Sequence, residues 1–112
     1  EAEGESNWMG RHFFTGGIMP SEDLFSRFDD DLVVAQRWRV NGRHYARTSR
    51  LWLENLDANR AAAERVLADG LGQAGARRQA ERWRMFFMAC EELFAWDRGE
   101  EWFVTHQLLR PR

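Results

Sequence analysis

Only two stretches of the 112-residue chain alternate between an inner and an outer face in the way that a β-strand does. They are residues 32–40 and 101–109, and helical patterns occupy most of the sequence between them. Two strands joined through helices cannot form a self-sufficient sheet. Either the helices carry the fold, or the strands belong to a sheet whose other strands lie outside this chain.

The helical patterns predict where the core lies. Helices over 44–57 and about 74–96 each have one apolar face, and the stretch 59–68 either continues the first helix or starts again. A short helix over about 21–28 is predicted from Ser21, a good N-cap residue, and from the acidic residues that follow it. One apolar row of the long helix consists of Ala80, Trp83, Phe87, Cys90 and Phe94.

The N-terminal region carries a different pattern. Residues 1–10 are predicted to be mobile, and residues 12–20 combine aromatic side chains with the pair Gly16-Gly17. A glycine pair reaches backbone conformations that are closed to other residues, so we predict a tight, buried loop here. We expect 1–112 to form a single segment. Because the chain begins at Glu1 rather than at a methionine, we expect it to be a piece of a larger protein.

Composition excludes several classes of function. The formal charge of −2 argues against nucleic acid as a partner. A single cysteine cannot form an internal disulfide, and no stretch of about 18 apolar residues predicts a membrane span. The three histidines lie far apart without metal-ligand spacing, and no glycine-rich phosphate loop is present. The sequence therefore predicts neither a metal site nor a nucleotide site within this chain.

Three residues on the predicted helices leave two interpretations open. Tyr45, the single tyrosine, is either a ring at the edge of the core or a hydroxyl that points into a cavity. Ser49 and Cys90 are small residues on packed faces. They either leave room for a ligand or allow two helices to approach closely, and Cys90 itself is predicted to be an inert buried thiol.

Three motifs occur in an order that resembles one known family. Residues 13–21 are similar to an aromatic-x-Gly-Gly-x-x-Pro-Ser loop. Residues 39–48 with Trp52 are similar to a helix start of the form Tyr-x-x-Thr-x-x-x-Trp, and residues 84–94 to a Cys-x-x-x-Phe helix that precedes a last strand. Together, over residues 8–109, they resemble the cyclopropane fatty acid and mycolic acid cyclopropane synthases.

The family consists of S-adenosylmethionine-dependent methyltransferases that add a methylene bridge across a cis double bond of a lipid acyl chain. The resemblance implies that this chain is the C-terminal part of an α/β, Rossmann-like methyltransferase domain. Its two strands would be the last two of a seven-stranded sheet, with the final strand antiparallel. By itself the chain would be α+β and mostly helical. The glycine-rich cofactor loop lies earlier in the family, so the expected partner is a missing N-terminal part that binds S-adenosylmethionine.

The resemblance also implies roles for single residues. Tyr45 matches a tyrosine that helps to hold a bicarbonate ion, which accepts the proton released on ring closure, and a neutral phenol is a suitable donor to that anion. Phe14 matches a ring on the active-site wall, where its face would stabilise a cationic intermediate. The implied substrate-binding positions are Ser49, Cys90, Phe94, Gly16 and Gly17.

The chain departs from the family pattern in several places. Thr15 stands where many members have proline, and Ser49 stands where many have leucine. The glutamate and histidine ligands of bicarbonate have no counterpart, and neither has the cofactor site. We therefore expect the isolated chain to be inactive and to bind neither S-adenosylmethionine nor bicarbonate.

Phospholipid acyl chains are the substrates that the resemblance implies. We expect a cytoplasmic enzyme and leave peripheral membrane contact and a homo-oligomer open. The alternative is a non-catalytic, mostly helical module that binds lipid or protein, which the large number of aromatic side chains favours.

Overall fold

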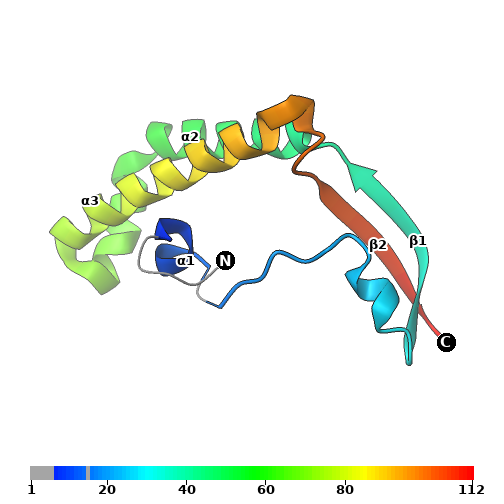
Figure 1. Cartoon of the computed structure of the whole chain (residues 1–112). Coiled ribbons are helices and arrows are strands. Elements are labelled where there is room, and N and C mark those ends of the chain that lie inside the picture. Colours follow the sequence, from blue (N-terminus) through cyan, green and yellow to red (C-terminus); the bar gives the residue numbers. More distant parts are fainter. Residues whose placement is uncertain (1–6, 15) are drawn as a thin grey trace. The chain divides into compact units, whose positions relative to one another are not determined.

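A computed structural model describes residues 7–14 and 16–112. The elements follow one another as helix α1 (Trp8–His12), 3-10 helix η1 (Leu24–Arg27), strand β1 (Leu32–Val40), helix α2 (Gly42–Ala58), helix α3 (Arg60–Ala95), 3-10 helix η2 (Trp96–Gly99) and strand β2 (Val104–Pro111), as Figure 1 shows. The chain divides into two compact units. We call Arg39–Val104 the helical unit, and the residues up to Trp38 together with Thr105–Arg112 the loop unit.

The two strands pair with each other in an antiparallel sheet. The backbone N–H of Arg112, just after β2, donates to the carbonyl of Asp31, just before β1, at 3.0 Å. The prediction of a strand over 32–40 is confirmed, and the second strand begins at Val104 rather than at residue 101. Residues 100–103 connect β2 to η2, in which Asp97 and Arg98 have positive φ angles.

The loop unit corrects two predictions. The α-helix predicted over 21–28 is wrong, since only Leu24–Arg27 is helical and the form is 3-10. Ser21 donates to the Asp23 carboxylate instead of capping a helix. Phe25 and Phe28 are 51% and 70% exposed, so this apolar side has no packing surface that would support an α-helix.

The predictions for the N-terminal region concern both described and undescribed residues. Residues 1–6 and Thr15 lie outside the described residues, whereas residues 8–10 of the stretch predicted to be mobile form the start of α1. The loop predicted to be buried is largely exposed: Ile18 is 79% and Met19 is 72% accessible. Gly16 does have the positive φ, +71°, for which a glycine is suited.

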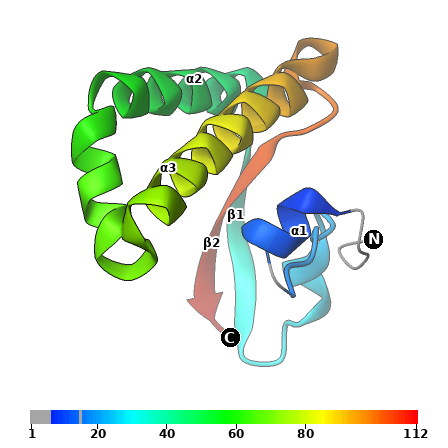
Figure 2. The ribbon, with the colours of Figure 1, turned by 90° about the vertical axis from the view of Figure 1, so that its left-hand side faces the viewer.

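In the helical unit, α2 packs against the later part of α3, and both Figures 1 and 2 show the two helices side by side. The long helix is interrupted at Gly72, with φ 67° and ψ 170°, so 60–71 and 73–95 are separate helical stretches. The restart after residue 59 and the helix over about 74–96 are therefore confirmed. The buried side chains on the facing surfaces are Ala46, Ser49 and Leu53 of α2 and Ala76, Ala80, Phe86 and Cys90 of α3.

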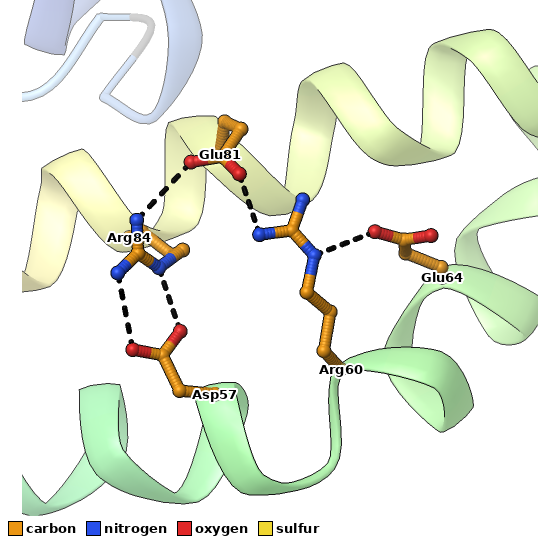
Figure 3. A network of polar contacts seen from close by, with 5 residues as sticks. All are labelled: Asp57, Arg60, Glu64, Glu81 and Arg84. Atoms are coloured by element: carbon orange, nitrogen blue, oxygen red, sulfur yellow. Dashed lines mark hydrogen bonds and ion pairs between the residues drawn. The ribbon is translucent and has the colours of Figure 1, made fainter.

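A network of five charged side chains joins the three helical stretches (Figure 3). Arg84 forms two parallel hydrogen bonds with Asp57 of α2, at 2.6 and 3.1 Å, and also reaches Glu81. Glu81 in turn pairs with Arg60, which pairs with Glu64 at 2.7 Å. The network holds the end of α2 and the stretch 60–71 against the later part of α3.

The start of α2 is tied to the segment that follows α3. The side-chain oxygen of Asn41 accepts from the N–H of Arg43 at 2.9 Å, which caps the helix. Its side-chain nitrogen donates to the carbonyl of Arg98 and to the carboxylate of Glu100. Gly42 leaves no space for a side chain, because a Cβ atom there would collide with the backbone carbonyls of Phe94 and Trp102. Asn41 and Gly42 therefore form the beginning of α2.

Candidate functional site

Tyr45 occupies the first turn of α2, on the side that faces the end of α3. Its half-buried ring meets Phe94 edge to face, with centroids 4.5 Å apart, and meets Trp52 in the same way at 6.0 Å. The described residues provide no recorded hydrogen-bond partner for the Tyr45 hydroxyl. The ring is thus at the edge of the core, as one of the two interpretations predicts, and its hydroxyl is available to a ligand.

The aromatic contacts continue along the helices away from Tyr45. Trp52 lies about two helical turns after Tyr45 in α2 and contacts Phe87, with ring centroids 5.8 Å apart. Phe87 stacks with Trp83 at 5.7 Å, and Trp83 also meets Phe86. We call Tyr45, Phe94, Trp52 and Phe87 the aromatic wall. Because Trp52 is 45% exposed, part of the wall is open to solvent.

Ser49 and Cys90 lie inside the interface of α2 and α3. Ser49 is fully buried, and its hydroxyl has no hydrogen-bond partner within the described residues. Cys90 is buried and not oxidised to a disulfide. Small residues here allow the two helices to approach closely, which is one of the two interpretations above. Contact of either residue with a substrate stays a prediction.

Burial sets the protonation of the two ionisable groups near the wall. It raises the pKa of the Tyr45 hydroxyl, and the charge of a nearby Cys90 thiolate raises this pKa further. Burial also raises the pKa of the Cys90 thiol. Both groups are therefore neutral near pH 7. Within the described residues, no cation lowers the pKa of the thiol toward that of a reactive thiolate, which agrees with an inert buried cysteine.

The other predicted site residues belong to the loop unit. Phe14 and Gly17 line an open, mainly apolar hollow of about 520 Å³, together with Asn7, Met9, Gly10, Ile18 and Met19. Gly16 precedes this lining and is exposed. Each unit thus carries its own group of predicted residues, Tyr45, Ser49, Cys90 and Phe94 in one and Phe14, Gly16 and Gly17 in the other.

Sequence reasoning did not select Trp52 and Phe87 as site residues, although both stand in the patterns that it described. The available signal was their spacing. Trp52 follows Tyr45 by seven residues and Phe94 follows Phe87 by seven, which places each pair on one face of its helix. Only the packing of α2 on α3 brings the two faces together.

Within residues 7–14 and 16–112, no cluster of three or more His, Cys, Asp or Glu side chains could hold a metal ion. None of the helices in the described region combines the length and the hydrophobicity that a membrane crossing requires.

Comparisons with known proteins connect this geometry to a family. No protein-family model matches the chain. (S)-Coclaurine N-methyltransferase of Thalictrum flavum subsp. glaucum is 33% identical over 96% of this chain and 31% of that protein. (S)-Tetrahydroprotoberberine N-methyltransferase of Eschscholzia californica is 33% identical over 100% of this chain and 33% of that protein.

A solved structure matches as well. The crystal structure of coclaurine N-methyltransferase bound to N-methylheliamine and SAH superimposes on 96% of this chain and 32% of that one, with a TM-score of 0.80 and 31% identity. The chain is related to the S-adenosylmethionine-dependent methyltransferases. It spans about a third of the length of the curated relatives it matches. The fold is that of a C-terminal part of a methyltransferase, which confirms the predicted fold class.

The methyltransferase part of the prediction is confirmed, but the type of methyltransferase is not. The relatives named above are N-methyltransferases, whereas the motifs resemble cyclopropane synthases. A fatty acyl substrate and a bicarbonate ion receive no support from these relatives. A shared fold does not specify the atom that receives the methyl group.

Proposed function

We propose that the chain forms the acceptor-binding part of an S-adenosylmethionine-dependent N-methyltransferase. The enzyme would methylate the nitrogen of an amine that carries an aromatic ring. One observation carries this proposal. The matching crystal structure, with a TM-score of 0.80, holds both an N-methylated amine and SAH, the form of the methyl donor that remains after transfer. The aromatic wall of the helical unit supports the proposal with chemistry of its own.

The reaction places a positive charge on the acceptor. S-Adenosylmethionine supplies its methyl group from a positively charged sulfur. The lone pair of the amine nitrogen forms the new N–C bond while the C–S bond breaks, and the electron pair of the broken bond stays on sulfur. The nitrogen becomes cationic, and a secondary amine then loses a proton to solvent or to a base.

The aromatic wall suits such an acceptor. The faces of Trp52, Phe87 and Phe94 present negative charge density to a cation, which contributes on the order of 0.5–2 kcal/mol per favourable contact. Tyr45 adds a neutral hydroxyl, because its raised pKa keeps the phenol protonated. An aromatic amine would pack its ring against these side chains and keep its nitrogen near the hydroxyl.

We expect the methyl donor to bind outside this chain. The sequence has no glycine-rich loop after a strand, and the two strands of the structure stand at the end of the methyltransferase fold. We therefore assign the donor to another part of the protein. Calorimetry on the 112-residue chain should detect no tight binding of S-adenosylmethionine, and tight binding would contradict this assignment.

A series of acceptors tests the proposed reaction. The full-length protein receives S-adenosylmethionine together with one of three compounds. These are heliamine, the analogue in which oxygen replaces its amine nitrogen, and N-methylheliamine, the tertiary amine. We expect methyl transfer to the amine nitrogen and none to the oxygen isostere, as detected by mass spectrometry of the product. Transfer to neither amine, with an acyl substrate accepted instead, would contradict the proposal.

The cyclopropanation of an acyl chain is the second candidate. The loop over residues 13–21 and the apolar hollow beside it favour this candidate, because an acyl chain would fit an open apolar surface. A direct competition between the amine and phospholipid acyl chains distinguishes the two candidates.

A further inference from the structure

A second hollow lies beside the aromatic wall, where α2 ends and α3 begins. It encloses about 400 Å³ and is open to solvent. All its lining residues belong to the helical unit: Trp52, Asn55, Leu56, Asn59, Ala63 and Phe87. The volume is sufficient for one aromatic ring and its substituents.

The apolar part of this hollow is formed by two rings. The centroids of Trp52 and Phe87 are 5.8 Å apart, and the ring planes meet at 55°. The Trp52 side chain is 45% exposed, so part of this large apolar ring is in contact with solvent. Two rings tilted in this way form a corner against which a third, flat ring can pack.

The polar part is an asparagine pair with a fixed arrangement. The side-chain nitrogen of Asn59 donates to the backbone carbonyl and to the side-chain oxygen of Asn55, both at 2.9 Å. These two bonds use both donors of Asn59. The side-chain nitrogen of Asn55 and the side-chain oxygen of Asn59 have no recorded partner in the described part of the chain. The pair thus presents one donor and one acceptor from a preorganised position.

Asp57 and Arg60, two charged residues near the hollow, already have partners. Asp57 is held by Arg84 through two hydrogen bonds, and Arg60 is paired with Glu64 and Glu81 (Figure 3). A charged ligand group would have to displace one of these partners. The chemistry of the hollow therefore favours a neutral ligand with a flat ring and a group that both donates and accepts a hydrogen bond.

We propose that this hollow is a binding subsite for a neutral aromatic ring that carries a hydroxyl group. The ring packs in the corner of Trp52 and Phe87, and the hydroxyl donates to Asn59 and accepts from Asn55. The role of this subsite rests on the proposed function, because the bound ring would belong to the methyl acceptor. Binding itself is measured without a methyl donor, so its failure would not bear on methyl transfer.

The experiment compares two probes that differ by one hydroxyl group. The ¹⁵N-labelled full chain is titrated with 4-ethylphenol and, separately, with ethylbenzene, and amide and indole shifts are followed by NMR. We expect the shifts to centre on the Trp52 indole and on the Asn55 and Asn59 side-chain amides. One hydrogen bond corresponds to roughly fivefold tighter binding of the phenol. Shifts centred elsewhere, or equal affinity for the two probes, would overturn the proposal.

Two variants complete the test. Asn55→Ala removes the free donor but keeps the backbone carbonyl to which Asn59 donates, so the preference for the phenol should fall while ethylbenzene still binds. Glu54→Ala, at the exposed neighbouring position, is the control and should leave both affinities unchanged. If the ratio of the two affinities is unchanged in Asn55→Ala, in a protein with a native-like spectrum, the asparagine pair serves only to end α2 and the proposal is wrong.

Discussion

The rings of Tyr45 and Phe94 meet edge to face at a centroid distance of 4.5 Å and an angle of 84°. This contact joins the first turn of α2 to the last turns of α3, and it holds the Tyr45 hydroxyl at the end of the aromatic wall. We therefore expect the Phe94 ring to contribute to stability, whereas the role proposed for Tyr45 in activity depends on its hydroxyl.

Phe94→Ala should destabilise the fold, and Tyr45→Phe should affect turnover. Removing the half-buried Phe94 ring loses about 2 kcal/mol of unfolding free energy, measured by denaturant titration of the full chain. Tyr45→Phe keeps the ring contact and loses only the hydroxyl, so in the full-length protein kcat should fall about tenfold or more while the KM for the amine changes little. Unchanged turnover would remove Tyr45 from the site.

The titration of Tyr45 can be observed directly, because it is the single tyrosine of the chain. Its folded-state pKa is raised above the unfolded value, so this group contributes stability below about pH 10, and the contribution is lost as the pH rises through the folded pKa. The phenolate absorbance should appear at higher pH in the folded chain than in denaturant. In Cys90→Ala the shift should be smaller but should persist, because burial is its larger cause.

The ion network predicts a local response in the stretch 60–71. Glu81→Gln breaks the link between Arg60 and Arg84, so backbone hydrogen exchange in 60–71 should accelerate, most clearly at low salt where the charges are least screened. Glu91→Gln breaks only the pair with Arg50 and is the matched control. Equal exchange in the two variants would show that packing, rather than the network, holds this stretch.

Acid should weaken the same network. Hydrogen bonds from Arg84 lower the pKa of Asp57, and those from Arg60 and then Arg84 lower the pKa of Glu81. The carboxylates contribute stability above their usual pKa values of about 4, and this is lost as the pH falls through the lower folded-state values. The exchange difference between Glu81→Gln and the unmodified chain should therefore disappear in acid.

Gly42 and Gly70 have opposite surroundings, so substitution by alanine should have opposite effects on stability. At Gly42 an added Cβ would collide with the carbonyls of Phe94 and Trp102, so Gly42→Ala should lose more than about 2 kcal/mol. At Gly70, which lies inside a helical stretch, nothing stands within 4 Å of an added Cβ, and Gly70→Ala should gain up to about 1 kcal/mol. Thermal and denaturant unfolding measure both, and similar effects at the two positions would contradict this account.

The elements that were predicted correctly are those with strong local signals. Residues 32–40 alternate, and the apolar row of 74–96 repeats at helical spacing. The short helix over 21–28 was predicted from Ser21 and its acidic neighbours, but capping alone does not stabilise a helix whose Phe25 and Phe28 have no packing surface.

The site was predicted only in part, because it depends on contacts between distant residues. Tyr45 and Phe94 were selected by motif, yet Trp52 and Phe87 join them only when α2 packs against α3. The asparagine pair carries no motif at all, since its chemistry comes from two hydrogen bonds that leave one donor and one acceptor unused. The comparisons support methyl transfer but not the acyl acceptor that the motifs implied, and a shared fold does not determine which atom is methylated.

The central claim is that the methyl group goes to an amine nitrogen. The most direct measurement is a competition in which the full-length protein receives isotopically labelled S-adenosylmethionine, heliamine and vesicles of a phospholipid with cis-unsaturated acyl chains in one reaction. We expect the label to appear as an N-methyl group on the amine and the acyl chains to stay unlabelled. Label in a cyclopropane ring or a methyl branch of the acyl chains, with unmodified amine, would contradict it.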